Sequence, residues 1–237
     1  MKDARIVNVF TEEIIRGDIA IQDGIIAGIG SFHGKEERDL AGRYVCPGFI
    51  DSHLHLESTL VTPAELVTVA SRHGTTTFIV DPHESANVSG LAGVDYILDQ
   101  TENVKANVYV MMPSCVPATS IDDNGCTLTA EDMAPYLHNS RILGLGEVMD
   151  SISVVQGEKS MHDKLELFEG RIRDGHAPFL EEGDLQAYAM AGIATDHECS
   201  FFDYAMRERR NGLTILVREA ALPEIWRRLL AVWCRDI

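Results

Sequence analysis

From residue 46 onward, short apolar runs alternate with stretches of helical periodicity, and this alternation limits the possible folds more than any other feature. We expect strands at residues 48–53, 75–81, 107–113, 143–148, 172–176, 192–196 and 213–217. We expect helices at residues 63–73, which follow a Thr62 cap and begin with proline, at 88–101, from Thr129 onward, and at 184–191. Nearly continuous apolar strands separated by helices are typical of a parallel sheet with helices packed outside it.

Polar residues follow many different strands, and this placement favours a barrel over a doubly wound sheet. The sequence also lacks a Gly-x-Gly-x-x-Gly pattern after a strand, which disfavours a dinucleotide-binding sheet. We therefore predict an α/β fold, a TIM-like (β/α) barrel that is incomplete because only seven strands are expected.

The first 46 residues have a different pattern from the rest of the chain. Runs at residues 6–10, 17–21 and 25–29 read as strands, and Asp23-Gly24 is a strong hairpin signal between the last two. We expect three regions: a small β-subdomain at 1–46, the incomplete barrel at 47–219, and a divergent amphipathic tail at 220–237. The tail is expected to be helical because its apolar residues, which include Trp226 and Trp233, recur at helical spacing.

Composition excludes several classes of partner. The formal net charge is −17, which argues against nucleic-acid binding and against binding to anionic membranes, since both need basic surfaces. No apolar run approaches the ~18–20 residues of a membrane span. The five cysteines form no Cys-x-x-Cys pair, which favours a reduced, cytoplasmic protein.

The histidines and one glutamate carry the chemical signal. His53 and His55 lie two residues apart on a strand, so their side chains point to the same side. Glu147, His176 and His197 each fall at the carboxyl end of a different expected strand, where a barrel has its mouth. Four imidazoles and one carboxylate suit a pair of divalent transition-metal ions with the carboxylate bridging them.

Simpler explanations exist for each residue alone. A lone His-x-His on a strand is usually not a metal site, and a single histidine after a strand is most often a hydrogen-bonded structural residue. The ordered set is what favours metal, because the His53–His55 pair and each of the other three residues lie at the same end of different strands. The remaining histidines outside strand ends are expected to have no role at the site: His33, His73, His138 and His162.

The segment Gly48-Phe49-Ile50-Asp51-Ser52-His53-Leu54-His55 resembles the first-strand motif of the amidohydrolase superfamily. Later segments narrow the resemblance to the bacterial adenine deaminase family. In order along the chain, these are His55-Leu56-Glu57-Ser58-Thr59, Val80-Asp81-Pro82-His83-Glu84, Met111-Met112-Pro113-Ser114-Cys115-Val116-Pro117-Ala118, Gly144-Leu145-Gly146-Glu147-Val148-Met149, Asp174-Gly175-His176-Ala177-Pro178 and Thr195-Asp196-His197-Glu198.

The resemblance implies hydrolysis of adenine to hypoxanthine and ammonia, by attack of metal-bound hydroxide on purine C6. It implies two divalent ions, manganese or iron with zinc as a further option, held by His53, His55, Glu147, His176 and His197. It also implies catalytic roles for Glu147, His197 and Glu84, with Glu57 as a second residue that orders the purine. Adenine is then the expected small-molecule partner, and a homo-oligomer is an open option.

The resemblance leaves two alternatives to adenine deamination. One is a related amidohydrolase such as a deacetylase or a cyclic amidase. The other is an inactive metal-binding fragment, because the family takes a proton-shuttling aspartate from an eighth strand that this sequence does not show. The expectation is therefore a truncated or frame-shifted copy of a longer enzyme. A local departure is Phe179, which stands where the family usually has glycine.

Overall fold

The computed structural model describes residues 1–119 and 121–218, so the expected tail at 220–237 lies outside the described residues. The chain divides into two compact units, of which the first is Met1–Phe49 and the second begins at Ile50. Among the described residues, we find no helix with the length and apolar character needed to cross a membrane.

The first unit is a four-stranded sheet in the order β3-β2-β1-β4. Its strands are β1 (Ala4–Asn8), β2 (Glu13–Gln22), β3 (Ile25–Gly30) and β4 (Tyr44–Val45). The hairpin predicted between β2 and β3 is confirmed, since the two strands pair antiparallel. Asp23 and Gly24 join them with φ angles of 52° and 78°. Two successive positive φ angles are what a two-residue type I′ hairpin turn needs, which explains the Asp-Gly sequence.

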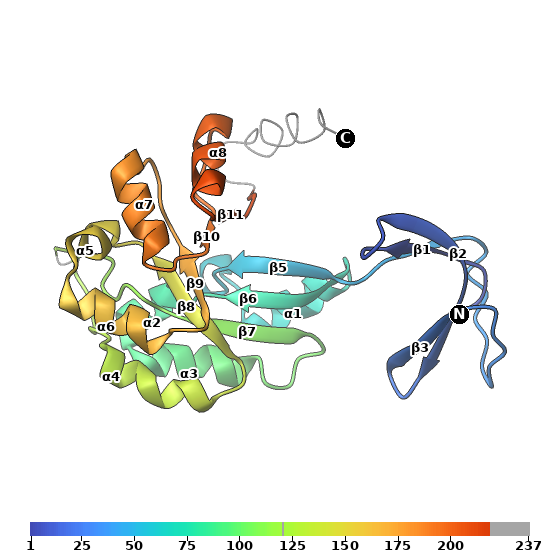
Figure 1. Cartoon of the computed structure of the whole chain (residues 1–237). Coiled ribbons are helices and arrows are strands. Elements are labelled where there is room, and N and C mark those ends of the chain that lie inside the picture. The colour runs from blue at the N-terminus through green and yellow to red at the C-terminus, as the bar shows by residue number, and fades with distance from the viewer. Residues whose placement is uncertain (120, 219–237) are drawn as a thin grey trace. The chain divides into compact units, whose positions relative to one another are not determined.

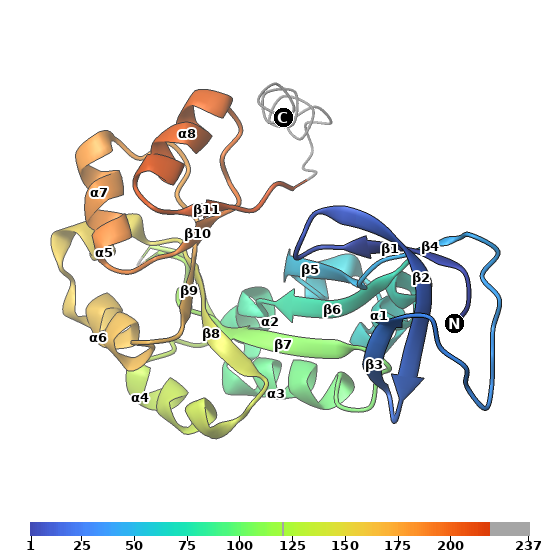
Figure 2. The same cartoon turned by 45° about the vertical axis from the view of Figure 1, so that its right-hand side comes forward.

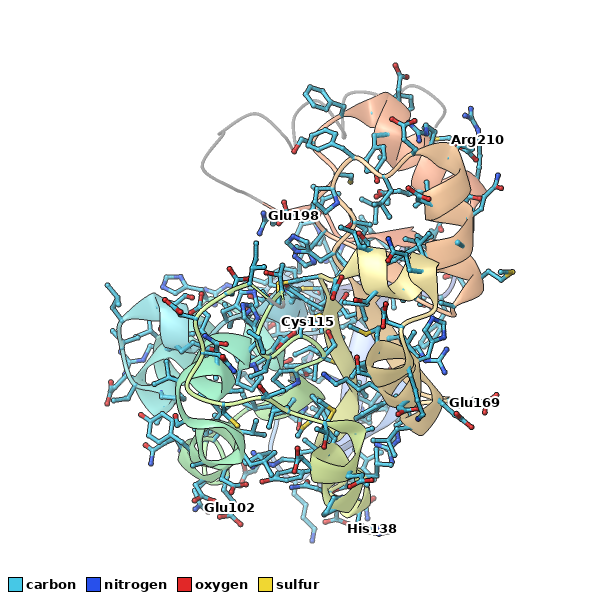
Figure 3. The ribbon with its side chains drawn as sticks, turned by 90° about the vertical axis from the view of Figure 1, so that its left-hand side faces the viewer. Glu102, Cys115, His138, Glu169, Glu198 and Arg210 are labelled. Carbon is cyan, nitrogen blue, oxygen red and sulfur yellow. The ribbon has the colours of Figure 1, made fainter. Side chains whose placement is uncertain are left out.

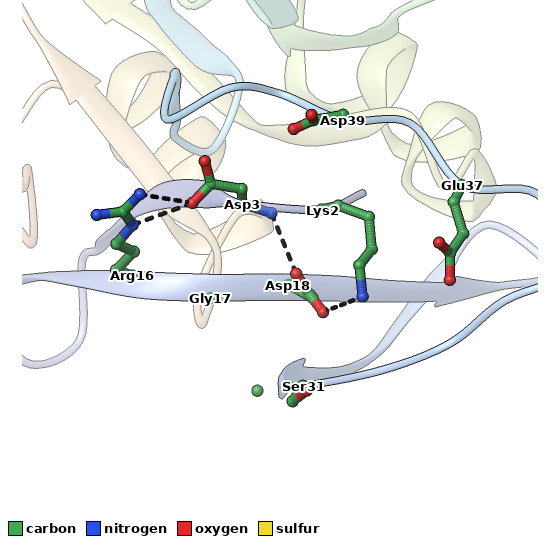
Figure 4. Close-up of a pocket in the computed structure, with 9 residues that line it drawn as sticks. Lys2, Asp3, Arg16, Gly17, Asp18, Ser31, Glu37 and Asp39 are labelled. Carbon is green, nitrogen blue, oxygen red and sulfur yellow. Dashed lines mark hydrogen bonds and ion pairs between the residues drawn. The ribbon is translucent and has the colours of Figure 1, made fainter.

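A shallow pocket in the first unit is lined mainly by charged side chains (Figure 4). Lys2 Nζ lies 2.5 Å from Asp18 Oδ2, and Arg16 Nη2 lies 2.9 Å from Asp3 Oδ1. The Lys2 contact holds the pKa of the Asp18 carboxyl well below its usual range. These charges satisfy one another between β1 and β2, so we assign them a role in the sheet's structure.

The second unit contains a five-stranded sheet in the order β5-β6-β7-β8-β9, with a two-stranded sheet, β10-β11, after it. The strands are β5 (Phe49–Leu54), β6 (Thr75–Val80), β7 (Asn107–Met112), β8 (Ile142–Val148), β9 (Ile172–Gly175), β10 (Thr195–Asp196) and β11 (Thr214–Ile215). The pairings from β6 to β9 are parallel, as is that of β10 with β11. All seven predicted strands are confirmed, and the sheet curls as a partial barrel (Figure 2).

The helices follow the strands. They are η1 (Glu57–Thr59), α1 (Pro63–Ser71), α2 (His83–Ser89), α3 (Leu91–Gln100), α4 (Ala130–Met133), η2 (Ala134–His138), α5 (Ser151–Gln156), α6 (Lys159–Leu167), α7 (Glu182–Met190) and α8 (Phe202–Arg210). Helices α3, α4 and α6 lie along the five-stranded sheet, whereas α7 and α8 lie beyond its end near β10 and β11 (Figures 1 and 2). Thr62 caps α1 as expected, since its side chain accepts a hydrogen bond from the Glu65 backbone N–H. Thr129 closes a capping box at α4 with Asp132.

One helix prediction was wrong in its bounds. The single helix expected at 88–101 is two helices, α2 and α3, which meet at Gly90. Gly90 has a φ of 62°, and a Cβ there would lie 2.7 Å from Cys126 Sγ. The backbone therefore leaves the helical conformation at a position where glycine alone fits without strain.

The main core lies between the sheet and its helices and is built from the buried apolar residues of both. Phe78, Val110 and Leu145 come from successive strands and are at most 1 % exposed. They pack with Ile97 of α3 and with Phe168, which follows α6. This packing fixes β5 to β9 side by side and therefore fixes where their carboxyl ends deliver polar side chains.

Candidate metal centre

The structure brings the five predicted ligand residues to one place at the carboxyl ends of the strands. His53 lies on β5, with His55 just after it, and Glu147 lies on β8; His176 and His197 follow β9 and β10. The predicted ligands form two groups of possible ligand atoms that share Glu147: one with His53 and His55, and one with His176 and His197. Further groups join Glu147 to Asp81 and His83, and join Asp174 to His53 and His197. Within each group the atoms lie within 4.8 Å of one another.

The imidazoles of His53 and His55 are held by their outer nitrogens. His53 Nδ1 lies 2.9 Å from Asp174 Oδ2, and His55 Nδ1 lies 2.8 Å from the Asp81 carbonyl oxygen. Both partners are acceptors, so each Nδ1 carries a hydrogen and each Nε2 faces inward. The two Nε2 atoms are 3.1 Å apart and lie 2.6 and 2.9 Å from Glu147 Oε1.

Glu147 occupies the centre of this group and is only 3 % exposed. Its backbone N–H donates to Asp81 Oδ2 at 2.7 Å, and its carbonyl oxygen accepts a hydrogen bond from the Ser114 hydroxyl. Burial disfavours the charged form, but the four surrounding imidazoles outweigh it and hold the pKa of the Glu147 carboxyl well below its usual range. Glu147 is therefore an ionised carboxylate surrounded by nitrogen ligands.

His176 and His197 have buried ring nitrogens without hydrogen-bond partners among the described residues. His176 Nδ1 lies 3.3 Å from Glu147 Oε2, and His197 Nε2 lies 3.2 Å from Glu147 Oε1, but neither contact has hydrogen-bond geometry. A buried polar atom without a partner costs free energy. A cation between these nitrogens and the carboxylate would satisfy them, so the donor set fits a divalent transition-metal ion.

The pKa values of the first histidine pair fit the same interpretation. Burial lowers the pKa of His53, but contacts with Asp174 and Glu147 outweigh it and raise the pKa to about 10. For His55, burial is likewise outweighed by Glu147 and the Asp81 carbonyl, and the pKa rises to about 9. In the metal-free protein, positive charge on these imidazoles therefore stabilises the Glu147 carboxylate, as a metal cation would.

Residues 44–228 match the family described as "Amidohydrolase family". The chain belongs to the amidohydrolase family. This membership and the two ligand groups together support binding of a divalent metal at the centre.

Named relatives within the amidohydrolases are similar over nearly the whole chain. The chain is 58% identical over 221 residues to "Adenine deaminase" of Desulfitobacterium hafniense (strain Y51), covering 93% of this chain and 39% of that protein. It is 48% identical over 223 residues to "Adenine deaminase" of Clostridium acetobutylicum, with coverage of 93% and 39%. The chain thus spans about two fifths of the length of these relatives.

A solved amidohydrolase-type structure supports the fold. N-acetyl-D-glucosamine-6-phosphate deacetylase from Mycobacterium smegmatis superposes with a TM-score of 0.59 at 13% sequence identity, covering 96% of this chain and 73% of that chain. At this identity the similarity concerns the fold alone. It confirms the barrel-type architecture that the strand pattern predicted.

Two further glutamates of the amidohydrolase motifs lie beside the centre, outside both ligand groups. Glu84, in the first turn of α2, is exposed and accepts a hydrogen bond from the Ser58 hydroxyl at 2.6 Å. Glu57 Oε1 accepts from the Ser85 backbone N–H at 3.2 Å. Their predicted contacts with a purine stay predictions.

Three acidic residues of the site were not predicted as site residues. Asp81 and Asp174 hold His55 and His53 as described, and Glu198 Oε1 lies 3.7 Å from His197 Nε2 and 3.9 Å from His176 Nδ1. Glu198 lies in the loop between β10 and α8 (Figure 3). Strand alternation could have pointed to Asp174, because it lies two residues before His176 and thus faces the same side.

Proposed function

We propose that this centre serves adenine deamination, the hydrolysis of adenine to hypoxanthine and ammonia. The observation that carries the proposal is the convergence of four imidazoles on one buried carboxylate, in a chain whose relatives at 58% and 48% identity are named adenine deaminases. A related deacetylase or cyclic amidase, and a metal-binding chain without activity, are the other outcomes that the assay below distinguishes.

We propose two divalent ions at the centre, manganese or iron, with Glu147 facing both. His53 and His55 would hold one ion and His176 and His197 the other, since Glu147 belongs to both ligand groups. When bound, such ions supply Lewis-acid activation of water and of the purine ring. The ring of His197 stacks on that of His53 at a centroid distance of 3.9 Å, which orients both imidazoles.

The chain's own residues provide the rest of the site. Glu147 and His197 are proposed to act directly at the reacting atoms, and Glu84 to order the purine with help from Glu57. The position of Glu84 supports this role: it adjoins His83, whose ring lies 4.6 Å from that of His55. Adenine as partner, cytoplasmic location, a homo-oligomeric state and the lack of nucleic-acid or membrane partners stay predictions.

The purified chain should be tested after loading with manganese, iron or zinc. Loss of adenine absorbance would be followed beside release of acetate from an N-acetyl sugar and ring opening of a hydantoin. Adenine turnover that disappears in Glu147→Gln supports the proposal. Turnover of another substrate without adenine turnover would overturn it, and bound metal without any turnover would favour the inactive alternative.

The role of Glu84 needs a test of its own. Glu84→Gln should raise KM for adenine and leave the metal content unchanged, because its carboxylate lies outside both ligand groups. A loss of bound metal in this variant would show that Glu84 acts on the centre and not on the purine.

A further inference from the structure

The first and last strands of the five-stranded sheet are joined by one side-chain contact at its mouth. β5 and β9 are the outermost strands in the order β5-β6-β7-β8-β9. Nevertheless, Asp174 of β9 reaches His53 of β5, with 2.9 Å between Oδ2 and Nδ1. Asp174 is 4 % exposed, so solvent competes little for this hydrogen bond.

Both oxygens of Asp174 have defined roles. Oδ2 faces His53, while Oδ1 accepts a hydrogen bond from the Gly175 backbone N–H at 3.0 Å and another from the Thr195 hydroxyl. The carboxylate is thus held by β9 itself and by the start of β10. Such a fixed acceptor leaves His53 Nδ1 only the donor role.

We propose that Asp174 is a positioning residue of the metal centre, which fixes the His53 ring so that its Nε2 lone pair faces Glu147. The inference rests on the proposed metal centre. Asp174 Oδ2 also belongs to a further group of possible ligand atoms, with His53 and His197, but its 2.9 Å contact with the outer nitrogen of His53 assigns it the positioning role. Hydrogen bonds to the second nitrogen of a ligating imidazole fix its tautomer and raise its basicity. The outer nitrogen of His55, Nδ1, donates to a neutral backbone carbonyl. Among the described residues, Asp174 is therefore the only charged acceptor for an outer nitrogen of His53 or His55.

Asparagine at position 174 would keep the shape of the side chain but replace one carboxylate oxygen with an NH₂ donor. In Asp174→Asn, the amide oxygen must face Gly175, because that backbone N–H can only donate. The amide NH₂ would then face His53 and force its Nδ1 to accept. The ring hydrogen would move to Nε2, which removes the lone pair that faces the centre.

The test is zinc affinity, measured by competition with a chelator. Asp174→Asn should bind zinc about 10–100-fold more weakly than the unchanged chain. The matched control is Asp163→Asn, which makes the same chemical change on α6, away from the centre. Asp163 Oδ2 there lies 2.6 Å from Lys159 Nζ. This control should leave zinc affinity unchanged.

A second measurement distinguishes positioning from a general structural effect. The zinc-loaded unchanged chain should show an imidazole N–H proton resonance that exchanges slowly with water, from His53 Nδ1. Asp174→Asn should lose this resonance while its thermal unfolding midpoint stays within a few degrees. Persistence of the resonance would overturn the inference.

The outcomes separate this inference from the proposed function. If the unchanged chain binds no zinc, the metal centre itself is wrong. If Asp174→Asn binds zinc as tightly as the unchanged chain, the metal centre stands and the positioning role is overturned. If Asp174→Asn does not fold, Thr195→Val decides: it removes one donor to Asp174 and should weaken zinc binding severalfold, and unchanged affinity would overturn the role.

Discussion

Metal binding at the centre should strengthen as pH rises, because a metal ion must displace a proton held between two imidazoles. In the metal-free protein the pKa values of His53 and His55 are raised to about 10 and about 9. Their Nε2 atoms lie 3.1 Å apart as a hydrogen-bonded pair, so at least one of them carries a proton at pH 7, and that proton must leave before metal can bind. One released proton makes the apparent association constant rise about 10-fold per pH unit, or about 100-fold from pH 6 to pH 8.

Isothermal titration with zinc in two buffers of different ionisation enthalpy would count the protons directly. We expect at least one proton released per bound ion at pH 7, and fewer in His55→Gln. An association constant that stays constant from pH 6 to pH 8, with no buffer dependence of the heat, would refute the reasoning. The metal-free chain should show the opposite trend: the stability that protonated His53 contributes is present below its usual pKa of 6.5 and is lost as pH rises through about 10.

Three further predictions concern the residues that support the centre. Gly146→Ala should lower the free energy of unfolding by about 1–3 kcal/mol in urea denaturation, because its Cβ would lie 2.2 Å from Asp81 Oδ2. The control is Gly183→Ala on α7, where nothing lies within 4 Å of the new Cβ. It should leave the free energy of unfolding unchanged or raise it by up to about 1 kcal/mol. Tyr188→Phe should cost about 1–3 kcal/mol in the same assay, because the buried hydroxyl bonds both the end of β8 and the chain after β9; an unchanged midpoint would contradict this. Burial raises the pKa of Glu208 to about 9, so stability should fall as pH rises from about 4.5 to about 9, and Glu208→Gln should remove this part of the pH dependence.

The strands, and the convergence of the five candidate ligand residues, could be predicted from sequence because both depend on local patterns. Strands buried on both faces read as continuous apolar runs, so even the two-residue strands β10 and β11 fell inside predicted segments. The convergence of these candidate ligand residues followed from a single rule, namely that parallel strands present their carboxyl ends at the same edge. That rule needs no knowledge of how far the sheet curls.

The features that were missed depend on tertiary contacts. The break at Gly90 arises from the close approach of Cys126, which lies 36 residues further along the chain in a loop without periodicity. The contact between Asp174 and His53 spans 121 residues and exists only because the sheet curls until its outer strands approach each other. Helices α5, α6 and α8 were not among the expected segments; they are only six to nine residues long, and α6 and α8 are rich in charged residues.

Phe179, which stands where the family usually has glycine, has a backbone conformation that favours glycine. It has a φ of 60°, in the left-handed region that favours glycine. This explains why a glycine was expected there. The phenylalanine ring lies 5.9 Å from that of Tyr204 and 6.1 Å from that of Phe201, so aromatic contacts offset some of the backbone strain.

The most direct test of the central claim is the metal content of the unchanged chain compared with Glu147→Gln. Both proteins would be loaded with manganese, dialysed and analysed for bound metal by mass spectrometry. Since both ligand groups share Glu147, the unchanged chain should retain up to two ions and the variant should lose both. Equal metal content in the two proteins would contradict a centre built around this carboxylate.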